Sequence, residues 1–357
     1  MAIKDTLSNA HSKWMEDSGP DNDVVISSRI RLARNLIGLP FPHFMSDADA
    51  RKVIGAVQTA ISQKSMIKKM GQLEFSEISK LSSIEREILV EKHLVSPHHI
   101  ENPVNRAVII ASDETVSIMV NEEDHLRIQC ILSGLQIEET WNLADKIDDL
   151  LEQVLDFSFC EKRGYLTSCP TNVGTGLRAS VMLHLPGLVM AKQVAQIVHA
   201  MSQIGLVVRG YYGEGTEASG NLFQISNQVT IGQTEAEIVK NLTAVTNQIV
   251  TQERSTREAV YRDNRQFLED RIYRALGTMR YARMVSSREA LKNISDIRLG
   301  VELGILKGLT FDRINELIIL TRAAFLMVRA AQQLTSEEIN FLRADVIREK
   351  LSDIKIN

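Results

Sequence analysis

The sequence predicts an α+β protein, in which an antiparallel β-sheet flanked by helices is followed by an all-helical part. Two observations lead to this prediction. Before about residue 234, β-rich apolar runs alternate with amphipathic helical segments, and two of the runs flank a short polar stretch, as in a hairpin. After residue 234 nearly every segment favours helix, and no strand pattern is visible. Hairpin-paired strands with helices packed on one face are typical of α+β domains.

The first half of the sheet region follows from local patterns. Residues 24–30 are β-rich and end in arginines, which predicts a strand. Residues 47–65 carry apolar side chains at helical spacing, with Asp47 as the expected N-cap. The short apolar runs 106–110 and 116–120 flank a polar stretch and predict the hairpin.

The second half alternates in the same way. Residues 141–155 are amphipathic and predict a helix, and residues 178–185 alternate before a Pro-Gly turn, which predicts a strand. A helix is expected over 189–204, where a glycine stops it. Strands over 206–209 and 222–229 then flank a glycine-rich connection.

The last part is predicted to be helical throughout. One long or two abutting helices cover 235–276 and end at Gly277, and shorter helices cover 287–294, 311–334 and 336–351. We expect a domain boundary near residues 252–258, giving a catalytic domain at 1–254 and a helical dimerisation and regulatory domain at 255–357. At ~150 residues per domain, two domains fit the 357 residues.

An apolar stripe in these helices predicts a homodimer. It holds more apolar residues than a single-layer helical appendage needs to bury, and exposed patches of that size usually mark a partner site. Its members are Ile305, Leu309, Ile314, Leu317, Ile318, Phe325 and Leu326.

Composition excludes several function classes. The net charge of −4 gives no basic field that would attract nucleic acid. No uncharged apolar run reaches ~18 residues, so no membrane span is expected. Three cysteines are few, and an odd number cannot all pair in a disulfide framework. No secretory signal is visible, so we expect free thiols in the cytoplasm.

Two arginines share one face of the first strand. The sequence reads SSRIRLARN at residues 27–35, and side chains two apart on a strand point the same way. Like charges at this spacing repel unless an anion lies between them. A solvated edge strand is one interpretation. A polyphosphate site is the other, because planar guanidinium groups bind phosphate oxygens bidentately.

Two further strings have the same double interpretation. After the strand at 116–120 comes NEEDHLR, either a polar turn or a carboxylate cluster at a strand end. Residues 169–180 read CPTNVGTGLRAS, either a plain glycine turn after a buried cysteine or a loop whose backbone N–H groups hold phosphate. It is neither a Walker A loop, since no lysine follows the glycine, nor a dinucleotide fingerprint, since no βαβ unit surrounds it.

Together these strings resemble one family. In the same order, with VRGYYGEGTEASGNLFQISN at residues 208–227, they are similar to the ATP:guanido phosphotransferase (phosphagen kinase) family over roughly residues 24–240. The resemblance implies a phosphagen-kinase-like catalytic domain. It also implies ATP as phosphoryl donor and Mg²⁺ held through the ATP phosphates and water, with no direct protein ligand.

The resemblance assigns roles to individual residues. Glu123 matches the carboxylate that orients the substrate guanidinium, Glu214 its second carboxylate partner, Cys169 the reactive cysteine, and Glu122 a residue that reaches magnesium through water. Five arginines match those that hold the nucleotide phosphates. The full set of implied ATP-binding residues is Ser28, Arg29, Arg31, His93, Arg127, Arg178, Ala179, Ser180, Arg209, Gly210, Tyr211 and Glu214.

Two departures favour the protein-arginine kinase branch of the family. The SSRIR strand begins at Ser27, so the helical domain that recognises small guanidino compounds is not expected. A helical segment from about residue 257 to 357, which the small-molecule enzymes lack, is added. Met182 and Gln224 stand where those enzymes have an adenine-side histidine and an aspartate. Of the RDxxRA motif that binds phosphoarginine in some protein-arginine kinases, only the last two residues match, at 343–344.

The resemblance therefore implies a kinase acting on exposed arginine side chains of proteins. It further implies partners of the Clp chaperone and protease type, a zinc-finger activator protein, and control of a stress-response repressor. Two alternatives stay open. One is a kinase for a small guanidino compound, and the other is a non-catalytic adaptor that binds arginine-rich partners. Every candidate site residue precedes the helical domain.

Overall fold

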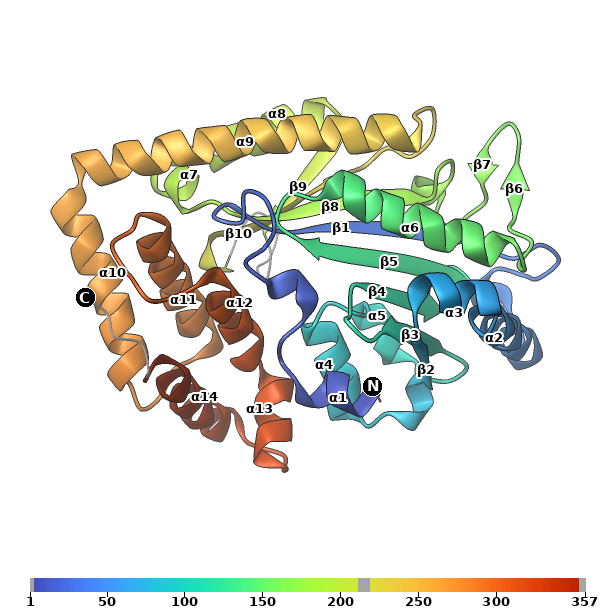
Figure 1. Ribbon diagram of the computed structural model, residues 1–357, viewed down its shortest axis with the longest axis horizontal. Helices are drawn as coiled ribbons and strands as arrows, with labels where there is room; N and C mark the ends of the chain where they lie inside the picture. The colour runs from blue at the N-terminus through green and yellow to red at the C-terminus, as the bar shows by residue number, and fades with distance from the viewer. Residues whose placement is uncertain (1–2, 211–218, 353–357) are drawn as a thin grey trace.

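The computed structural model describes residues 3–210 and 219–352. Its centre is an eight-stranded antiparallel sheet with the order β2-β3-β4-β5-β1-β8-β10-β9 (Figure 1). A separate pair, β6 (Phe159–Cys160) and β7 (Gly164–Tyr165), forms a small ribbon. The strands of the large sheet are β1 (Val25–Arg34), β2 (Leu73–Glu77), β3 (Ala107–Ala111), β4 (Val116–Val120), β5 (Leu126–Ser133), β8 (Leu177–His184), β9 (Leu206–Gly210) and β10 (Leu222–Asn227).

One face of the sheet is covered by helices from the first part of the chain. Ile30 and Leu32 of β1 lie in this core. The arginines at positions 29 and 31 alternate with them and therefore point to the opposite face. Figure 1 shows the long helix α9 and helix α6 lying along this side. The helices that contribute to this core are α2 (Asp47–Ile61), α3 (Lys64–Met70), α6 (Ile137–Glu152), α7 (Pro186–Met190), α8 (Val194–Gln203) and α9 (Glu235–Asp263).

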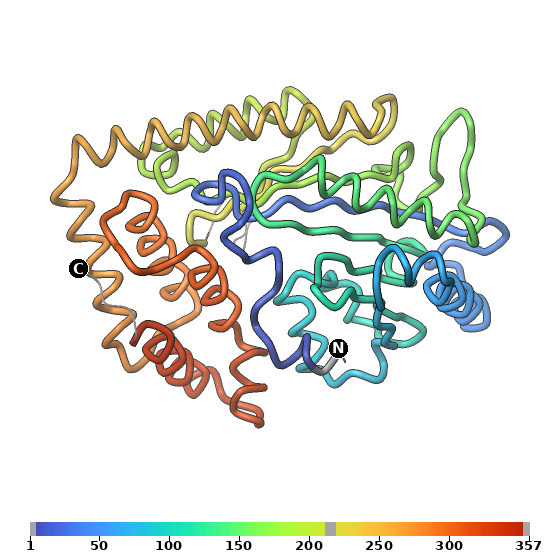
Figure 2. Tube along the Cα trace, viewed as in Figure 1, coloured from blue at the N-terminus to red at the C-terminus, as the bar shows by residue number. Residues whose placement is uncertain are grey.

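The other face shares a second core with the C-terminal helices. Ile26, Met119 and Met182 of the sheet pack in one cluster with residues from both ends of the chain. The tube in Figure 2 shows the C-terminal helices beside the sheet, next to the N-terminal segment. The remaining helices are α1 (Ile3–Ser8), α4 (Ser83–Glu91), α5 (Pro97–Glu101), α10 (Arg265–Tyr281), α11 (Ser287–Glu302), α12 (Phe311–Leu320), α13 (Ala323–Ala330) and α14 (Ser336–Leu351).

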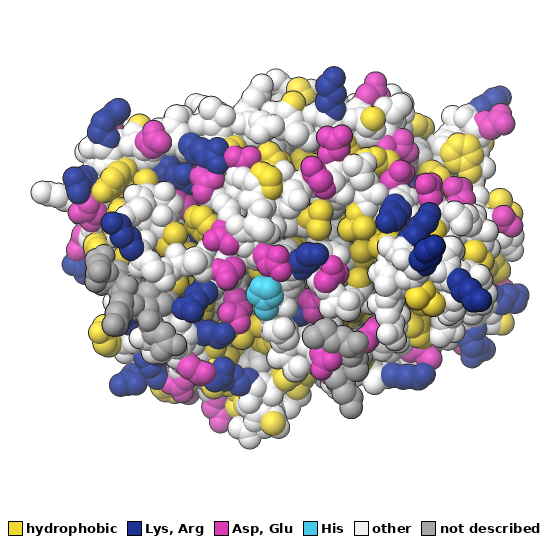
Figure 3. All heavy atoms as spheres, viewed as in Figure 1, with side chains coloured by type: hydrophobic (Ala, Val, Ile, Leu, Met, Phe, Trp, Pro, Cys, Tyr) yellow, Lys and Arg dark blue, Asp and Glu magenta, His cyan; other side chains and the backbone are white. Residues whose placement is uncertain are grey.

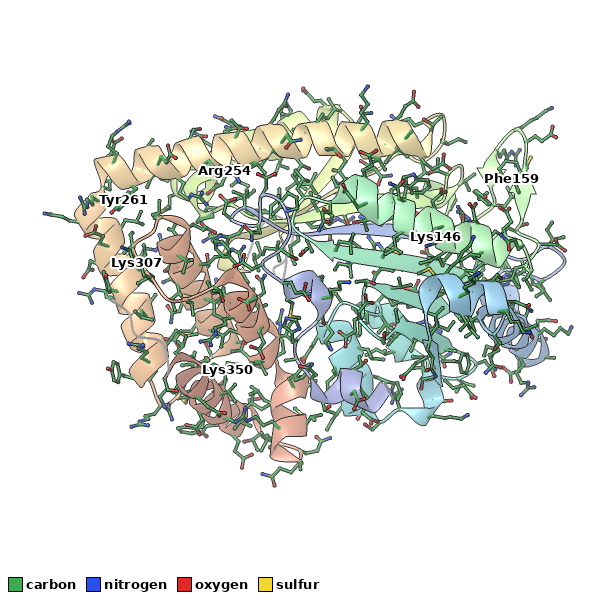
Figure 4. The ribbon with its side chains drawn as sticks, in the orientation of Figure 1. Lys146, Phe159, Arg254, Tyr261, Lys307 and Lys350 are labelled. Atoms are coloured by element: carbon green, nitrogen blue, oxygen red, sulfur yellow. The ribbon has the colours of Figure 1, made fainter. Side chains whose placement is uncertain are left out.

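The proposed domain boundary at 254/255 lies inside α9 and within a network of ion pairs. Asp23 accepts hydrogen bonds from Arg254 Nε at 3.0 Å and Arg257 Nη2 at 2.9 Å. Glu302 of α11 accepts from Arg257 Nη1 at 2.9 Å and pairs with His184 Nδ1 at 2.8 Å. Figure 4 labels Arg254 in the middle of the long helix. The two parts are therefore joined by a continuous helix, by buried charges and by a shared core.

Most predicted elements are confirmed, with corrections at their ends. Asp47 is not the N-cap of α2: the Ser46 side chain accepts from Asp49 N, and the Asp49 carboxylate accepts from Ser46 N, in a capping box. The helix expected over 189–204 is two helices, α7 and α8, because Lys192 between them has a φ of 59°. The sequence prediction also missed strands β2 and β5.

The C-terminal helices also differ in extent from the prediction. The 235–276 segment divides at Asn264, and α10 runs through Gly277 to Tyr281. Helix α11 is eight residues longer than expected, since it ends at Glu302 rather than Ile294. The segment expected as one helix over 311–334 is broken after Leu320 and holds α12 and α13.

The apolar stripe that motivated the dimer prediction is buried by other parts of the same chain. All its members are buried except Ile305, which is half-buried. The stripe thus completes an intramolecular core and offers no exposed apolar face. A homodimer stays a prediction that this stripe no longer supports. None of the described helices is long and apolar enough to cross a membrane.

Candidate active site

Four strands present arginines on the face opposite α6 and α9. The antiparallel register places Arg31 of β1 directly opposite Arg178 of β8, and Arg127 of β5 opposite Ala33, one diagonal step from Arg31. Arg209 of β9 is paired with Gln224 on the neighbouring strand. Like charges directly opposite one another destabilise a sheet. The arrangement is therefore costly without an anion.

The electrostatics of the cluster show the same cost. Burial lowers the pKa of Arg31 well below its ordinary value, and the charges of Arg29, Arg127 and Arg178 lower it further. Burial and the neighbouring arginines lower the pKa of Arg178 to about 10. Among the described residues, Nε of Arg31 and Nε of Arg178 are buried without a hydrogen-bond partner. Both facts point to a polyanionic ligand, because phosphate oxygens would supply charge and acceptors together.

A cavity of about 430 Å³ opens in front of these arginines. Its lining holds four arginines and one carboxylate, so it is strongly positive. The lining residues are Arg29, Arg31, Val90, Glu91, His93, Val95, Ser96, Pro97, Met119, Arg127, Gln129 and Arg322.

His93 joins this cavity to a smaller one beside β8 and β10. The smaller cavity is lined by Ser180, Met182 and Gln224 together with Arg29 and His93. Arg29 Nη2 donates to Gln224 Oε1 at 2.7 Å, so Gln224 fixes the position of this arginine beside the cavity. Burial lowers the pKa of His93 to about 3, with further lowering by Arg29 and Arg322. His93 is therefore a neutral side chain at physiological pH.

Glu122 and Glu123 line the same cavity, but their charges act on different arginines. Glu122 accepts from Arg127 Nη1 at 2.8 and 2.6 Å and from the hydroxyl of Ser96. Burial raises the pKa of Glu122, but Arg127 and Ser96 outweigh it and hold that pKa at about 2. Glu122 is therefore a charged carboxylate at neutral pH, and it fixes the position of Arg127.

Glu123 lies between the arginines and a second cavity. Its charge raises the pKa of Arg178, which places it near the phosphate site. It also lines a cavity of about 420 Å³ with Asp47, His43, His98 and Asn105. Glu123 therefore lies between Arg178 and this second cavity.

Cys169 is positioned by contacts of its loop. Asp124 Oδ1 accepts from Asn35 Nδ2 at 2.6 Å and from Ser168 N at 2.7 Å, which ties the loop to the NEEDHLR turn. Cys169 Sγ lies 3.0 Å from Thr171 Oγ1 and is half-buried. Gly174 has a φ of 113°, and a Cβ there would lie 2.3 Å from Thr230 O, so only glycine fits.

The structure does not bring every predicted residue into the site. The Ser28 hydroxyl donates to Gly134 O at 2.8 Å on the opposite face of the sheet, and the Ala179 methyl lies in the core there. Gly210 is the last residue of β9. Tyr211 and Glu214 lie outside the described residues.

Sequence reasoning also missed two residues. Asp124 could not be singled out, because the sequence of a polar turn does not show which of its acids holds the neighbouring loop. Arg322 lines the 430 Å³ cavity from the C-terminal part of the chain, and its only sequence signal is an arginine inside an apolar segment.

The described part of the chain holds no group of three or more His, Cys, Asp or Glu side chains that could bind a metal ion. Figure 3 shows acidic and basic side chains interspersed over one face of the molecule.

Comparison with known proteins agrees with this geometry. Residues 52–256 match the family model described as ATP:guanido phosphotransferase, C-terminal catalytic domain, and residues 265–357 match that of the protein-arginine kinase McsB C-terminal domain. Over 354 residues the chain is 54% identical to a protein-arginine kinase from Desulforamulus reducens, covering 99% of both chains. This chain belongs to the protein-arginine kinase family. A Bacillus subtilis member is 47% identical, covering 98% of this chain and 96% of its own.

Solved structures share the catalytic fold. A lombricine kinase structure superposes with a TM-score of 0.59 and 25% identity, covering 67% of this chain and 69% of its own. A duplicated taurocyamine kinase from Schistosoma mansoni, with bound transition-state analogue components, gives 0.60 and 26%, covering 67% of this chain and 34% of its own. Family membership makes this chain an ATP-dependent guanidino phosphotransferase.

Proposed function

We propose that this protein transfers the γ-phosphoryl group of ATP to guanidino nitrogens of arginine side chains in other proteins. The observation that carries the proposal is the position of Glu123, between the arginine face of the sheet and a second cavity. The cationic side suits ATP, and the carboxylate side suits a guanidinium. Similarity to protein-arginine kinases along the whole chain supports a protein acceptor over a small guanidino compound.

The arginines and Glu123 have different proposed roles in an in-line phosphoryl transfer. Arg29, Arg31, Arg127 and Arg178 hold the triphosphate and offset the charge on the moving phosphoryl group. Mg²⁺, bound to the phosphate oxygens, would supply further positive charge. The bond from guanidino nitrogen to γ-phosphorus forms as the bond from γ-phosphorus to the ADP oxygen breaks. Glu123 orients the guanidinium and accepts the proton that the nitrogen loses.

We propose further roles and partners by family resemblance. Glu214 is the proposed second carboxylate and Cys169 the thiol beside the guanidinium. By family resemblance we propose a Clp-type chaperone or protease, a zinc-finger activator and a stress repressor as partners, and a homodimer as the assembly. The three cysteines are unpaired in the described structure, in keeping with our proposal of a cytoplasmic protein.

The choice of acceptor is tested by competition. The protein is incubated with γ-labelled ATP and a folded arginine-containing protein, with and without excess free arginine. We expect label on the protein, and little loss of it when free arginine is added. The same acceptor with its exposed arginines changed to lysine should stay unlabelled. Preferential labelling of free arginine would support a small-molecule kinase, and no transfer to any acceptor would support the adaptor alternative.

A further inference from the structure

The nucleotide cavity is closed on one side by the C-terminal helices. Eleven of its twelve lining residues come from residues 29–129, and the twelfth is Arg322. Arg322 is in extended conformation, with φ −77° and ψ 152°, at the junction between α12 and α13. It is half-buried, and its charge acts on both His93 and Glu91.

Helix α14 fixes the backbone before Arg322. Arg343 Nε donates to Thr321 O at 2.7 Å, and Arg343 Nη1 donates to Val285 O at 2.9 Å. Arg343 itself is only 3% exposed. It therefore holds the α12–α13 junction from within the helical part, which accounts for this remnant of the RDxxRA motif without a ligand.

Helix α4 fixes the backbone after Arg322. The carboxylate of Glu91, at the end of α4 and in the cavity wall, accepts from Ala324 N at 3.0 Å and Phe325 N at 3.2 Å. These are free N–H groups of the first turn of α13. The junction is thus held from both sides, by the helical part and by the catalytic part, with Arg322 between the two attachments.

We infer that Arg322 is a nucleotide-binding residue that the C-terminal helices supply to the ATP site. This rests on the proposed function, since it takes the cavity as the ATP site. A fourth guanidinium group in a cavity with one carboxylate matches the multiple negative charges of a triphosphate. Because binding linkage is reciprocal, ATP should also stabilise the docked position of α12 and α13.

The first test measures ATP affinity by calorimetry on the full chain. Losing one charged hydrogen bond should weaken ATP binding about 10- to 100-fold in Arg322→Ala, with less loss in Arg322→Lys. Adenosine binding should change less than ATP binding. Arg329→Ala is the matched control, because Arg329 lies on α13, which follows Arg322, but is exposed and pairs with Glu349. It should bind ATP as the wild type does.

The second measurement uses the wild-type protein, so a folding defect in a variant cannot affect its result. When ATP is added, hydrogen exchange should slow in residues 311–330 and also in β1. Protection of β1 without any change in 311–330, or an Arg322→Ala affinity within twofold of wild type, would overturn the inference and leave the kinase proposal intact. A wild-type protein that binds no ATP would overturn the proposed function, and this inference with it.

Discussion

Removing one arginine of the ATP cluster should stabilise the nucleotide-free protein while it impairs function. Arg178 is the best position, because burial and then Arg209, Arg127 and Arg29 lower its pKa from 12.5 to about 10. That shift corresponds to about 3 kcal/mol of lost stabilisation of the charged form. Arg178→Met also loses the hydrogen bond from Nη2 to Ser226 Oγ at 3.2 Å, a cost of about 1 kcal/mol. We expect a net gain of about 1–2 kcal/mol.

The pH dependence of this penalty has a definite sign. The folded-state pKa is below the unfolded-state value, so the penalty is fully present below pH 10 and is relieved only as the pH rises above about 10. Urea denaturation at neutral pH without nucleotide is therefore the suitable assay. Arg51→Met, at an exposed position of α2, is the control and should change stability little.

ATP affinity should fall in this variant although its stability rises. Arg178→Met should weaken ATP binding about 10- to 100-fold, because charged hydrogen bonds to phosphate are lost. A variant that is less stable than wild type without nucleotide, or that keeps wild-type ATP affinity, would refute the argument that an anion offsets this cluster.

Three further changes test other parts of the account. Glu123→Gln should abolish phosphotransfer with unchanged ATP affinity and an intact fold, and measurable turnover near the wild-type rate would remove Glu123 from the mechanism. Burial raises the pKa of Glu253 to about 8, so the stability of the wild type relative to Glu253→Gln should fall between about pH 4.5 and pH 8, as urea titrations across that range would reveal. Alkylation should inactivate the enzyme through Cys169, which mass spectrometry would locate, and not through the fully buried Cys130; Cys169→Ser should lower activity without loss of fold.

The arginine site could be predicted because strand periodicity is a local property. Alternation alone places Arg29 and Arg31 on one face, and the structure agrees. The adjacent acids Glu122 and Glu123 follow the strand in a bent segment, so the alternation rule does not apply to them, and both line one cavity. The pairing of Arg31 with Arg178 could not be derived from local pattern, because the register between β1 and β8 depends on the whole sheet.

The role of the C-terminal helices could not be predicted for a related reason. An apolar stripe shows that a surface will be buried but not by what, and here the partner is the same chain rather than a second copy. Arg322 reaches the cavity only because α13 docks on α4, more than 200 residues earlier in the chain. Similarly, the break after Leu320 depends on Arg343 and Glu91, which hold the backbone on either side.

The central claim is tested most directly by the chemical bond that the enzyme makes. A folded protein acceptor is incubated with the enzyme and ATP, and the product is followed by phosphorus-31 NMR and by stability in acid. The account predicts a phosphoramidate signal that is lost in acid and kept in base, formed by the wild type and absent with Glu123→Gln. An acid-stable phosphate ester, or a phosphoramidate formed equally well by the Glu123→Gln variant, would contradict it.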